Sequence, residues 1–538
     1  MSSPSFDLIS QPWFRTRRSD NTVTELSLID VLGSAHQIVG LAGEVPTQDL
    51  ALLRLLLAIL RRSFPQMRSR EDWAEAWRAG RFDMAPIERY LERHRERFDL
   101  LHAETPFLQV AGLSTAKGEM TELTRLIADV PAGHAYFTTR AGAALTTMTF
   151  AEAARWIVHC QAYDPSGIKS GAVGDDRVTG GRGYPIGIAW AGWLGAVVVE
   201  GASLFETLLL NLPLGKKLPD PAVDLPVWER PPLGPGIEDR PGAPYGPVDL
   251  LTWPSRRIRL GHDGERATGV LIANGDPLHP RNMFRYEFMT GWRLSETQMK
   301  AQKTTDPVFM PRAHVPDRAV WRGLESLLTP TNDTQRTIAG RWLEWLAELQ
   351  ANEILPESFP LRIRTTGMQY GSQSAVIDDI TDDVLPLHLV VLTDTQLTDL
   401  AIKGVQAVGE AVRTLGQLAS ELIQAAGGDR DLAAAHRDEA REQGYAALDA
   451  AYRQWVGGLA AESDRAAEHE RWQRQVRRRV SELGRELLDS ASPASWSGRP
   501  SGTDGSPPVT AATAANWFYI NLRKALPMAY DVPEGQAS

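Results

Sequence analysis

The chain has 538 residues, of which 43% are hydrophobic and 23% are charged, and it carries 45 glycines and 35 prolines. This balance excludes a wholly disordered or fibrous chain, and the length predicts two or three domains. The single cysteine, Cys160, excludes an intramolecular disulfide and a cysteine-based zinc site, and it fits a reducing compartment, so we expect a cytoplasmic protein. The net charge of −10 argues against a protein that coats nucleic acid over its whole surface, but it allows a local basic groove.

The N-terminal part of the chain is predicted to mix helices and strands. Leucines crowd nearly every face of residues 47–62, which predicts a helix buried in a core, and residues 150–162 are predicted to form another helix. The apolar run at residues 183–199 is shorter than the ~20 residues that span a bilayer, so it predicts a buried helical segment and no membrane association. Strand-like alternation follows at residues 257–260 and 361–364.

The composition changes after about residue 394, and the rest of the chain is predicted to be helical. Gly427–Gly428 is typical of a helix C-cap, and residues 490–508 form a linker rich in serine, glycine and proline. The predicted helices cover residues 396–426, 431–459, 464–488 and 511–525. Because the first connections are short, we predict an α+β chain with a mixed α/β domain at residues 1–394 and a four-helix bundle at residues 395–538.

The motifs of common catalytic sites are absent from the sequence, which has no paired-histidine zinc motif, no P-loop and no nucleophile elbow. His102 and His279 are isolated and are predicted to be hydrogen-bonded structural residues. The acidic pairs Asp175–Asp176 and Asp378–Asp379 would suit a nuclease, but adjacent carboxylates in loops are more often solvated turn residues. An enzyme is therefore the weaker hypothesis, and no cofactor or metal is expected.

Two loops rich in small residues are candidates for contact with nucleic acid. Residues 166–171, continuing to Arg182, offer backbone N–H groups beside two cations and suit close approach to a phosphate or a groove floor. Residues 367–375 carry Gln373, whose amide can insert between base pairs or bond to base edges. The alternatives are a mobile surface loop in the first case and a plain polar hairpin tip in the second.

A third candidate is a row of arginines on the third C-terminal helix. Arg471, Arg474 and Arg478 share one helical face, which suggests contacts to the phosphates of DNA. The alternative is a solvated helix face whose arginines pair with neighbouring glutamates such as Glu468 and Glu470.

Several motifs occur in an order that resembles one known family. They are residues 102–109 (HAETPFLQ), 167–171 (GIKSG), 371–374 (GSQS) and the C-terminal helical segment. Together they resemble the CasA family, the large subunit of Cascade, which is the type I-E CRISPR surveillance complex. The resemblance implies a non-catalytic subunit for antiviral defence whose partners are guide RNA, the other Cascade subunits and double-stranded target DNA. It also implies that the subunit recognises the protospacer-adjacent motif, initiates strand separation and helps recruit a helicase-nuclease.

The resemblance assigns roles to single residues. Gln373 takes the place of the family's glutamine wedge, with Ser372 and Ser374 beside it at positions that read the minor groove. Gly167 lies in the family's glycine loop, and Lys169 is expected to contact phosphate nearby.

Two further residues match the family, and the sequence departs from the family's pattern in two places. Tyr136 and Phe137 match a loop that meets guide RNA and neighbouring subunits. Some members of the family bind zinc through a cysteine cluster, but residues 261–267 of this chain contain no cysteine. Thr268 aligns with the family's lysine finger, so Arg266 is the nearest cation that can replace that lysine. The alternative functions are a metal-dependent DNA-processing enzyme and a protein scaffold without base contacts.

Overall fold

The computed structural model describes residues 4–130, 138, 140–214, 219–316, 318–328, 336–498 and 509–530. Within these ranges the chain divides into two compact units. The first comprises Met1–Arg318, Thr329–Ile354 and Leu361–Val384, and the second comprises Ala319–Leu328, Leu355–Pro360 and Leu385–Ser538. The first unit mixes helices and strands and the second is helical, which confirms the predicted α+β class. The helical unit starts at Leu385 rather than at residue 395, and it takes in two earlier segments of the chain.

A small antiparallel sheet and several helices begin the first unit. These elements are β1 (Phe14–Arg18), β2 (Val23–Leu26), α1 (Leu28–Gly33), β3 (Ile38–Leu41), α3 (Arg70–Ala79) and α4 (Met84–Arg93). The sheet has the order β2-β1-β3, and Phe14 lies opposite Leu26. α3 starts at a capping box in which the side chains of Ser69 and Asp72 each accept a hydrogen bond from the other residue's backbone N–H, so its first turn is fixed locally.

The core of the first unit contains the two helices predicted from their apolar pattern, α2 (Pro46–Ser63) and α6 (Phe150–Tyr163). Nearly every side chain of α2 is buried, as predicted, and the two helices pack against each other. His159 of α6 accepts or donates a hydrogen bond with the Thr47 hydroxyl at 2.9 Å. Burial lowers the pKa of His159 to about 3, so the imidazole is neutral and the contact between the helices carries no charge at physiological pH.

The apolar run at residues 183–199 does not form the predicted helix. It contains the end of β5 (Arg182–Gly183), a 3-10 turn at Trp190–Trp193 and most of β6 (Ala196–Glu200). Glycines and Pro185 interrupt a helix in this run, and the consecutive valines of β6 favour a strand. A short apolar run cannot distinguish a buried strand from a buried helix by periodicity, which is why the prediction was wrong.

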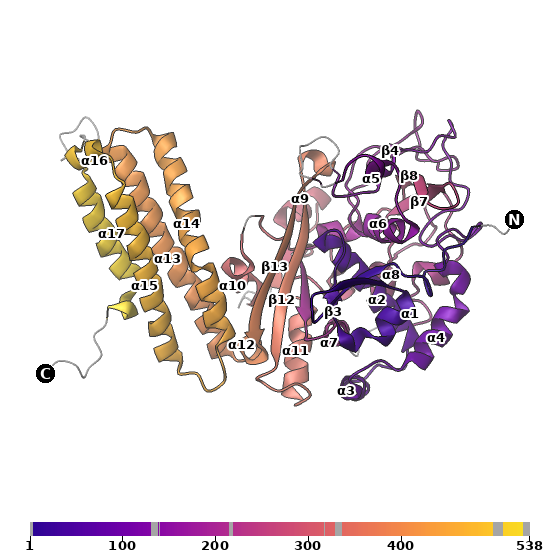
Figure 1. Cartoon of the computed structure of the whole chain (residues 1–538), viewed down its shortest axis with the longest axis horizontal. Coiled ribbons are helices and arrows are strands. Elements are labelled where there is room, and N and C mark those ends of the chain that lie inside the picture. Colours follow the sequence, from indigo (N-terminus) through magenta and orange to yellow (C-terminus); the bar gives the residue numbers. More distant parts are fainter. Residues whose placement is uncertain are drawn as a thin grey trace. The chain divides into compact units, whose positions relative to one another are not determined.

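A long antiparallel hairpin supports the candidate loop that carries Gln373. Its strands are β12 (Pro360–Tyr370) and β13 (Ile377–His388), and the sheet order is β13-β12-β6 (Figure 1). In β12, Arg364 binds Asp382 of the neighbouring strand, with Nε and Oδ1 2.7 Å apart, and it also reaches Glu200 and Asp49. These ion pairs tie the middle of the hairpin to β6 and α2, so its tip projects from a fixed base.

A second hairpin is formed by β7 (Arg256–His262) and β8 (Ala267–Asn274), where strand-like alternation was predicted. The register shifts at Gly261/His262, which marks a bulge next to the turn. The other strands of the first unit are β4 (Lys169–Ser170), β9 (Trp292–Leu294), β10 (Phe309–Pro311) and β11 (Thr337–Ile338), and its other helices are α5 (Ala143–Thr146), α7 (Leu204–Leu210), α8 (Pro247–Leu251), α9 (Glu296–Gln302) and α11 (Arg341–Ala351).

The second unit is built around four long helices that lie side by side (Figure 1). They are α13 (Thr395–Ala425), α14 (Arg430–Gly457), α15 (Arg465–Asp489) and α17 (Ala511–Ala525), and the shorter helices are α10 (Leu324–Leu328), α12 (Leu389–Thr393) and α16 (Pro493–Ser497). The four long helices match the predicted ranges closely. Asp394, Asp429 and Asp464 cap the first three by accepting hydrogen bonds from backbone N–H groups of the first turn.

An aromatic cluster fills the core of the second unit. The rings of Trp455 and Trp472 are stacked with centroids 5.0 Å apart, and Tyr452 meets Trp472 edge-on at 5.6 Å. Trp472 donates its indole N–H to the Gly404 carbonyl at 3.0 Å. A Cβ atom at Gly404 would lie 2.4 Å from the Trp455 ring, so the absence of a side chain there lets α13 approach the two indoles.

Candidate nucleic-acid interface

The tip of the β12–β13 hairpin is a compact turn that exposes Gln373. We call residues 371–376 the glutamine tip; residues 367–370, predicted to belong to the loop, are part of β12. The Gly371 N–H donates to the Val376 carbonyl at 3.0 Å, and the Ser374 N–H donates to the Gly371 carbonyl at 2.8 Å. Gln373 is exposed and has left-handed backbone angles, φ 55° and ψ 19°, which L-residues rarely adopt outside turns. The two backbone hydrogen bonds therefore hold Gln373 in a conformation that an unconstrained loop would rarely adopt.

The candidate loop at residues 166–171 is fixed at its base by a buried carboxylate. Asp164 follows the last residue of α6, and its Oδ2 atom lies 2.5 Å from Lys169 Nζ and 2.5 Å from Arg256 Nε. We call these three residues the Asp164 cluster. Burial alone would raise the pKa of Asp164, but Lys169 and Arg256 outweigh it and hold the pKa below its ordinary value. The carboxylate is therefore ionised and shared between two cations.

Arg256 extends this anchoring to the backbone around the loop. Its Nη2 donates to the carbonyls of Pro165 at 3.0 Å and Gly187 at 2.8 Å, and the side chain is only 1% exposed. Its neighbour Arg257 is also fully buried and holds the carbonyls of Gly234 and Gly236. Successive side chains of a strand point to opposite faces, so one dipeptide of β7 fixes two separate loops.

The two candidate loops meet each other. We call residues 166–171 the glycine loop. The Ser166 N–H donates to the Ser374 carbonyl at 2.8 Å, and a Cβ atom at Gly167 would lie 3.8 Å from Ala375 Cβ. Next to the tip, Tyr370 at the end of β12 donates its hydroxyl to the Tyr163 carbonyl at 2.7 Å, one residue before Asp164. The structure therefore brings Gly167 together with the glutamine tip, as a shared DNA-reading site would require.

Two of the predicted cations do not point into this shared site. The Lys169 ammonium is bound to Asp164, and its side chain is 13% exposed, so it holds the loop in place and is not a free phosphate contact. Arg266 is exposed in the β7–β8 turn and donates to the Thr147 hydroxyl at 3.2 Å. The glycine loop lies near the other end of β8, where Asn274 contacts Tyr184, roughly 25 Å away at ~3.3 Å per strand residue. The structure therefore separates Arg266 from the two candidate loops.

The arginines of α15 lie on its exposed face, opposite the buried Trp472 and Val476. Two of them have acidic partners within the helix: Arg471 pairs with Glu468, and Arg474 pairs with Glu470. Among the described residues, Arg478 is exposed and has no ion-pair or hydrogen-bond partner. The pairing expected for a solvated helix face is thus present for two of the three arginines. Tyr136 and Phe137, predicted to contact guide RNA, lie outside the described residues.

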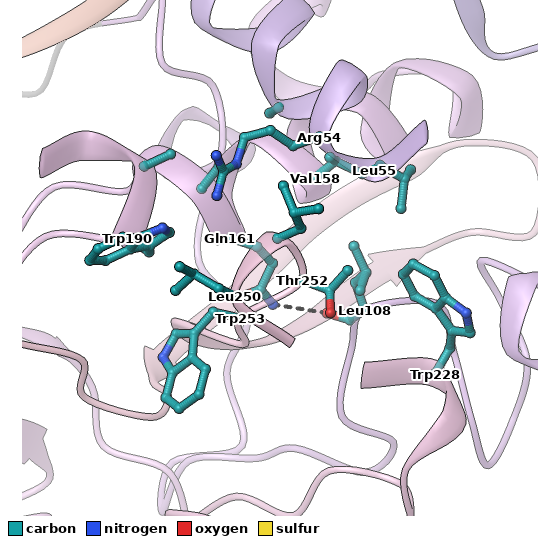
Figure 2. A pocket seen from close by; sticks show the side chains of 14 residues that line it. Arg54, Leu55, Leu108, Val158, Gln161, Trp190, Trp228, Leu250, Thr252 and Trp253 are labelled. Atoms are coloured by element: carbon teal, nitrogen blue, oxygen red, sulfur yellow. Dashed lines mark hydrogen bonds between the residues drawn. The ribbon is translucent and has the colours of Figure 1, made fainter. Parts of the chain in front are cut away.

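A small internal space lies beside the end of α6 that leads into the glycine loop. Figure 2 shows a cavity of about 30 Å³ between α2, α6 and α8, lined by Arg54, Val158 and Trp253 among others. Gln161 crosses its floor and donates to the Leu108 carbonyl at 3.1 Å. Such a space holds about one water molecule.

Other kinds of site were sought in the same part of the chain. In the described ranges no group of three or more His, Cys, Asp and Glu side chains could hold a metal ion. None of the helices in those ranges combines the length and the apolar character needed to cross a membrane. His102 accepts hydrogen bonds from the backbone N–H groups of Glu104 and Thr105, as predicted for a structural histidine.

Comparison with known proteins places this fold and sequence in one family. Residues 7–483 match the family described as CRISPR-associated protein Cse1. The chain belongs to the Cse1 family. A CasA/Cse1 protein of Thermus thermophilus is 30% identical over 441 residues, which are 79% of each chain. The crystal structure of Cse1 from Thermobifida fusca is 43% identical, with a TM-score of 0.90 over 98% of this chain and 99% of that one.

A more distant neighbour of this Cse1-family chain was solved as a CRISPR RNA-guided surveillance complex. It is 20% identical, has a TM-score of 0.66 and covers 91% of this chain and 99% of its own, so it shares the fold. The predicted CasA-type resemblance is therefore confirmed at the level of the family.

Sequence reasoning missed the residues that shape the interface of this Cse1-family chain. Asp164 and Arg256 are ordinary polar residues in the sequence, and their pairing joins positions 92 residues apart. The one available signal was the Arg256–Arg257 dipeptide at the start of the alternating segment 257–260, since alternation is typical of a strand that is buried on one face. Two adjacent arginines cannot both face solvent in such a strand, so at least one required an internal partner.

Proposed function

We propose that this chain is the non-catalytic large subunit of a type I-E CRISPR surveillance complex, where it recognises the protospacer-adjacent motif in duplex DNA. In this role it initiates strand separation beside the motif and helps recruit a helicase-nuclease for antiviral defence. Membership of the Cse1 family and the fold shared with a surveillance-complex subunit support the proposal. Base pairing between guide RNA and target reads the long sequence in such a complex, while protein reads only a short motif.

The observation that carries the proposal is the contact between the glycine loop and the glutamine tip. The Ser166–Ser374 hydrogen bond holds the glycine loop, in which Gly167 has no side chain, beside the tip that carries the exposed Gln373 amide. Backbone next to Gly167 can approach a groove closely, and the Gln373 amide can bond to base edges or occupy the gap between two base pairs. Ser372 and Ser374 flank the amide with hydroxyl groups that suit the minor groove, where few distinct base patterns are presented.

The cations take revised roles in this proposal. Lys169 positions the glycine loop through Asp164, and Arg266 is left out of the motif-reading group because the structure places it at the far end of β8. Tyr136 and Phe137 remain the proposed contacts to guide RNA or to neighbouring subunits.

Replacing Gln373 by alanine is expected to weaken binding of motif-positive duplex DNA by the assembled complex by about 5- to 150-fold, because an amide–base contact of this kind contributes ~1–3 kcal/mol. Binding is measured on motif-positive and motif-mutated duplexes, with Gln369→Ala as the control, since Gln369 is an exposed glutamine on the same hairpin. The control should bind like the wild type.

Equal binding of both duplexes by the wild-type complex would instead indicate a scaffold or a non-specific clamp. Divalent-metal-dependent cleavage by the isolated chain would indicate a DNA-processing enzyme.

We also propose that the exposed face of α15 holds target DNA through its phosphates. Replacing Arg471, Arg474 and Arg478 together by alanine should reduce the slope of log affinity against log salt by about 2–3, since each phosphate contact contributes roughly 0.9 to that slope. Arg478→Ala alone should account for about one contact, because its guanidinium is not engaged within the described residues. Arg413→Ala is the matched control: Arg413 lies on α13, is 65% exposed and pairs with Glu410 much as Arg471 pairs with Glu468. An unchanged slope in the triple variant rules out this surface.

A further inference from the structure

The short β4–β5 ladder next to the glutamine tip has two faces of opposite character. Lys169 pairs with Gly183 across the ladder, and Ser170 pairs with Arg182. Residues directly opposite each other in an antiparallel pair share a face, and successive residues alternate. Lys169 and Gly183 therefore lie on one face, whereas Ser170 and Arg182 lie on the other.

The first of these faces points into the protein. Lys169 binds the buried Asp164, and a Cβ atom at Gly183 would lie 2.9 Å from Nδ2 of Asn274. The same asparagine amide donates to the Tyr184 carbonyl at 2.6 Å. The contacts of Lys169 with Asp164 and of Asn274 with Tyr184 therefore fix the inward face of the ladder and restrict movement of its backbone.

Ser170 and Arg182 lie on the opposite face, and the exposed residues Ile168 and Tyr184 flank the two strands; we call these four residues the ladder face. Ile168 is 55% exposed and Tyr184 is 54% exposed, although both are large and largely apolar. Arg182 is exposed, and within the described residues its guanidinium has no hydrogen-bond or ion-pair partner. An isoleucine, a tyrosine and a free cation on one rigid face are the components of a platform that stacks bases and holds their phosphates.

The ladder face continues directly into the proposed reading site. A Cβ atom at Gly167 would touch Ala375, and Ile168 follows Gly167 directly, while Tyr184 follows the end of β5. An apolar surface that begins one residue from the glutamine tip is where a base freed by strand separation would arrive. Apolar and aromatic side chains stabilise such unstacked bases in other proteins that open duplexes.

We propose that the ladder face is a stacking shelf for a nucleobase that leaves the duplex beside Gln373, with Tyr184 and Ile168 against the base and Arg182 on its phosphate. The inference rests on the proposed function, adds Tyr184, and gives Ile168 a stacking role that neither the motifs nor the family resemblance indicated. It also assigns the phosphate contact of this loop to Arg182, whose cation is free, and not to Lys169, whose cation is bound to Asp164.

The test uses the assembled complex and motif-positive duplexes that carry 2-aminopurine at the first position beside the motif, in one strand or the other. Tyr184→Ala is expected to reduce the opened fraction, measured by fluorescence, by about tenfold in its equilibrium constant, since base–aromatic stacking contributes ~1–3 kcal/mol. Tyr184→Phe should retain opening because the ring remains, and Ile168→Ala should show a smaller loss. Val23→Ala, at a 45% exposed position on β2, should have no effect.

A second duplex separates stacking from other roles of Tyr184. When the base at the labelled strand's first position is replaced by an abasic site, wild type and Tyr184→Ala should bind equally well, because nothing remains to stack. Arg182→Ala should lower the salt slope of binding by about one on both duplexes. A Tyr184→Ala complex that opens DNA like the wild type, or one whose defect persists on the abasic duplex, overturns the shelf. If the wild type does not discriminate between motif-positive and motif-mutated DNA, the proposed function itself fails.

Discussion

Replacing Asp164 by asparagine is expected to lower the free energy of unfolding of the first unit by about 3–5 kcal/mol, because removal of one member of a buried ion pair leaves its partners uncompensated. Lys169 and Arg256 both depend on this carboxylate, and their side chains are only 13% and 1% exposed. The glycine loop should lose its fixed base at the same time, so DNA binding should fall together with stability.

The pH dependence of this effect has a defined sign. The pKa of Asp164 is held below its ordinary value in the folded chain, so folding favours the ionised form. Its contribution is fully present above the pKa of an unfolded aspartate, about 3.9, and it disappears as the pH falls through the lower folded value. The difference in unfolding free energy between wild type and Asp164→Asn should therefore shrink on acidification below about pH 4.

Urea denaturation followed by tryptophan fluorescence, at neutral and at acidic pH, measures both quantities. Asp176→Asn is the control, since Asp176 is an exposed carboxylate in the same segment and should change stability by less than about 0.5 kcal/mol. Adding Lys169→Met to Asp164→Asn should recover part of the loss by removing one uncompensated charge. A double variant less stable than the single one would contradict this explanation.

Replacing Trp472 by alanine should destabilise the second unit by about 3–5 kcal/mol, the usual range for removal of a buried large aromatic side chain. Trp472 is fully buried, stacks on Trp455 and donates to the Gly404 carbonyl, so the change opens a cavity and removes both contacts. The loss of helical circular dichroism in urea, measured on the full chain, reports this transition.

Trp496 provides the matched control for that experiment. It belongs to α16 of the same unit, but it is 51% exposed, so Trp496→Ala should have a small effect. Trp472→Phe should lie between the two, because a ring remains while the indole hydrogen bond is lost. Equal effects of Trp472→Ala and Trp496→Ala would show that the aromatic cluster does not determine the stability of the bundle.

Sequence patterns within short windows predicted the helices that are specified by residues close together in the chain. The leucines of α2 and the aspartate caps of α13, α14 and α15 specify those helices within short windows of sequence, and their predicted ranges were close to the observed ones. The run that contains β6 was misassigned because its strand character depends on pairing with β12, more than 150 residues later. The β12 segment shows alternation at residues 361–364, but the continuous apolar run of β6 has none that would identify it as a strand.

The candidate site was predicted only in part, because contacts between residues far apart in the sequence leave no local pattern. Gln373 and Gly167 stand out as an amide and a glycine in small-residue loops, and their proximity follows from a hydrogen bond that no local pattern encodes. The sequence also could not show that Lys169 is bound internally whereas Arg182 is free. That distinction depends on Asp164 and on the two-residue alternation of a very short ladder.

The division of the chain affects how the protein can be dissected into fragments. The chain passes from the first unit to the second within β13, between Val384 and Leu385, and not in a loop. Trp321 comes from an earlier segment, yet it stacks on Tyr452 at 4.6 Å and donates to Asp449 at 2.7 Å. A fragment that begins at the predicted boundary, residue 395, would therefore lack the tryptophan that covers Tyr452 and would expose an aromatic surface prone to aggregation. A bundle expressed on its own needs residues 319–328 restored, for example through a fused segment, before its DNA binding can be interpreted.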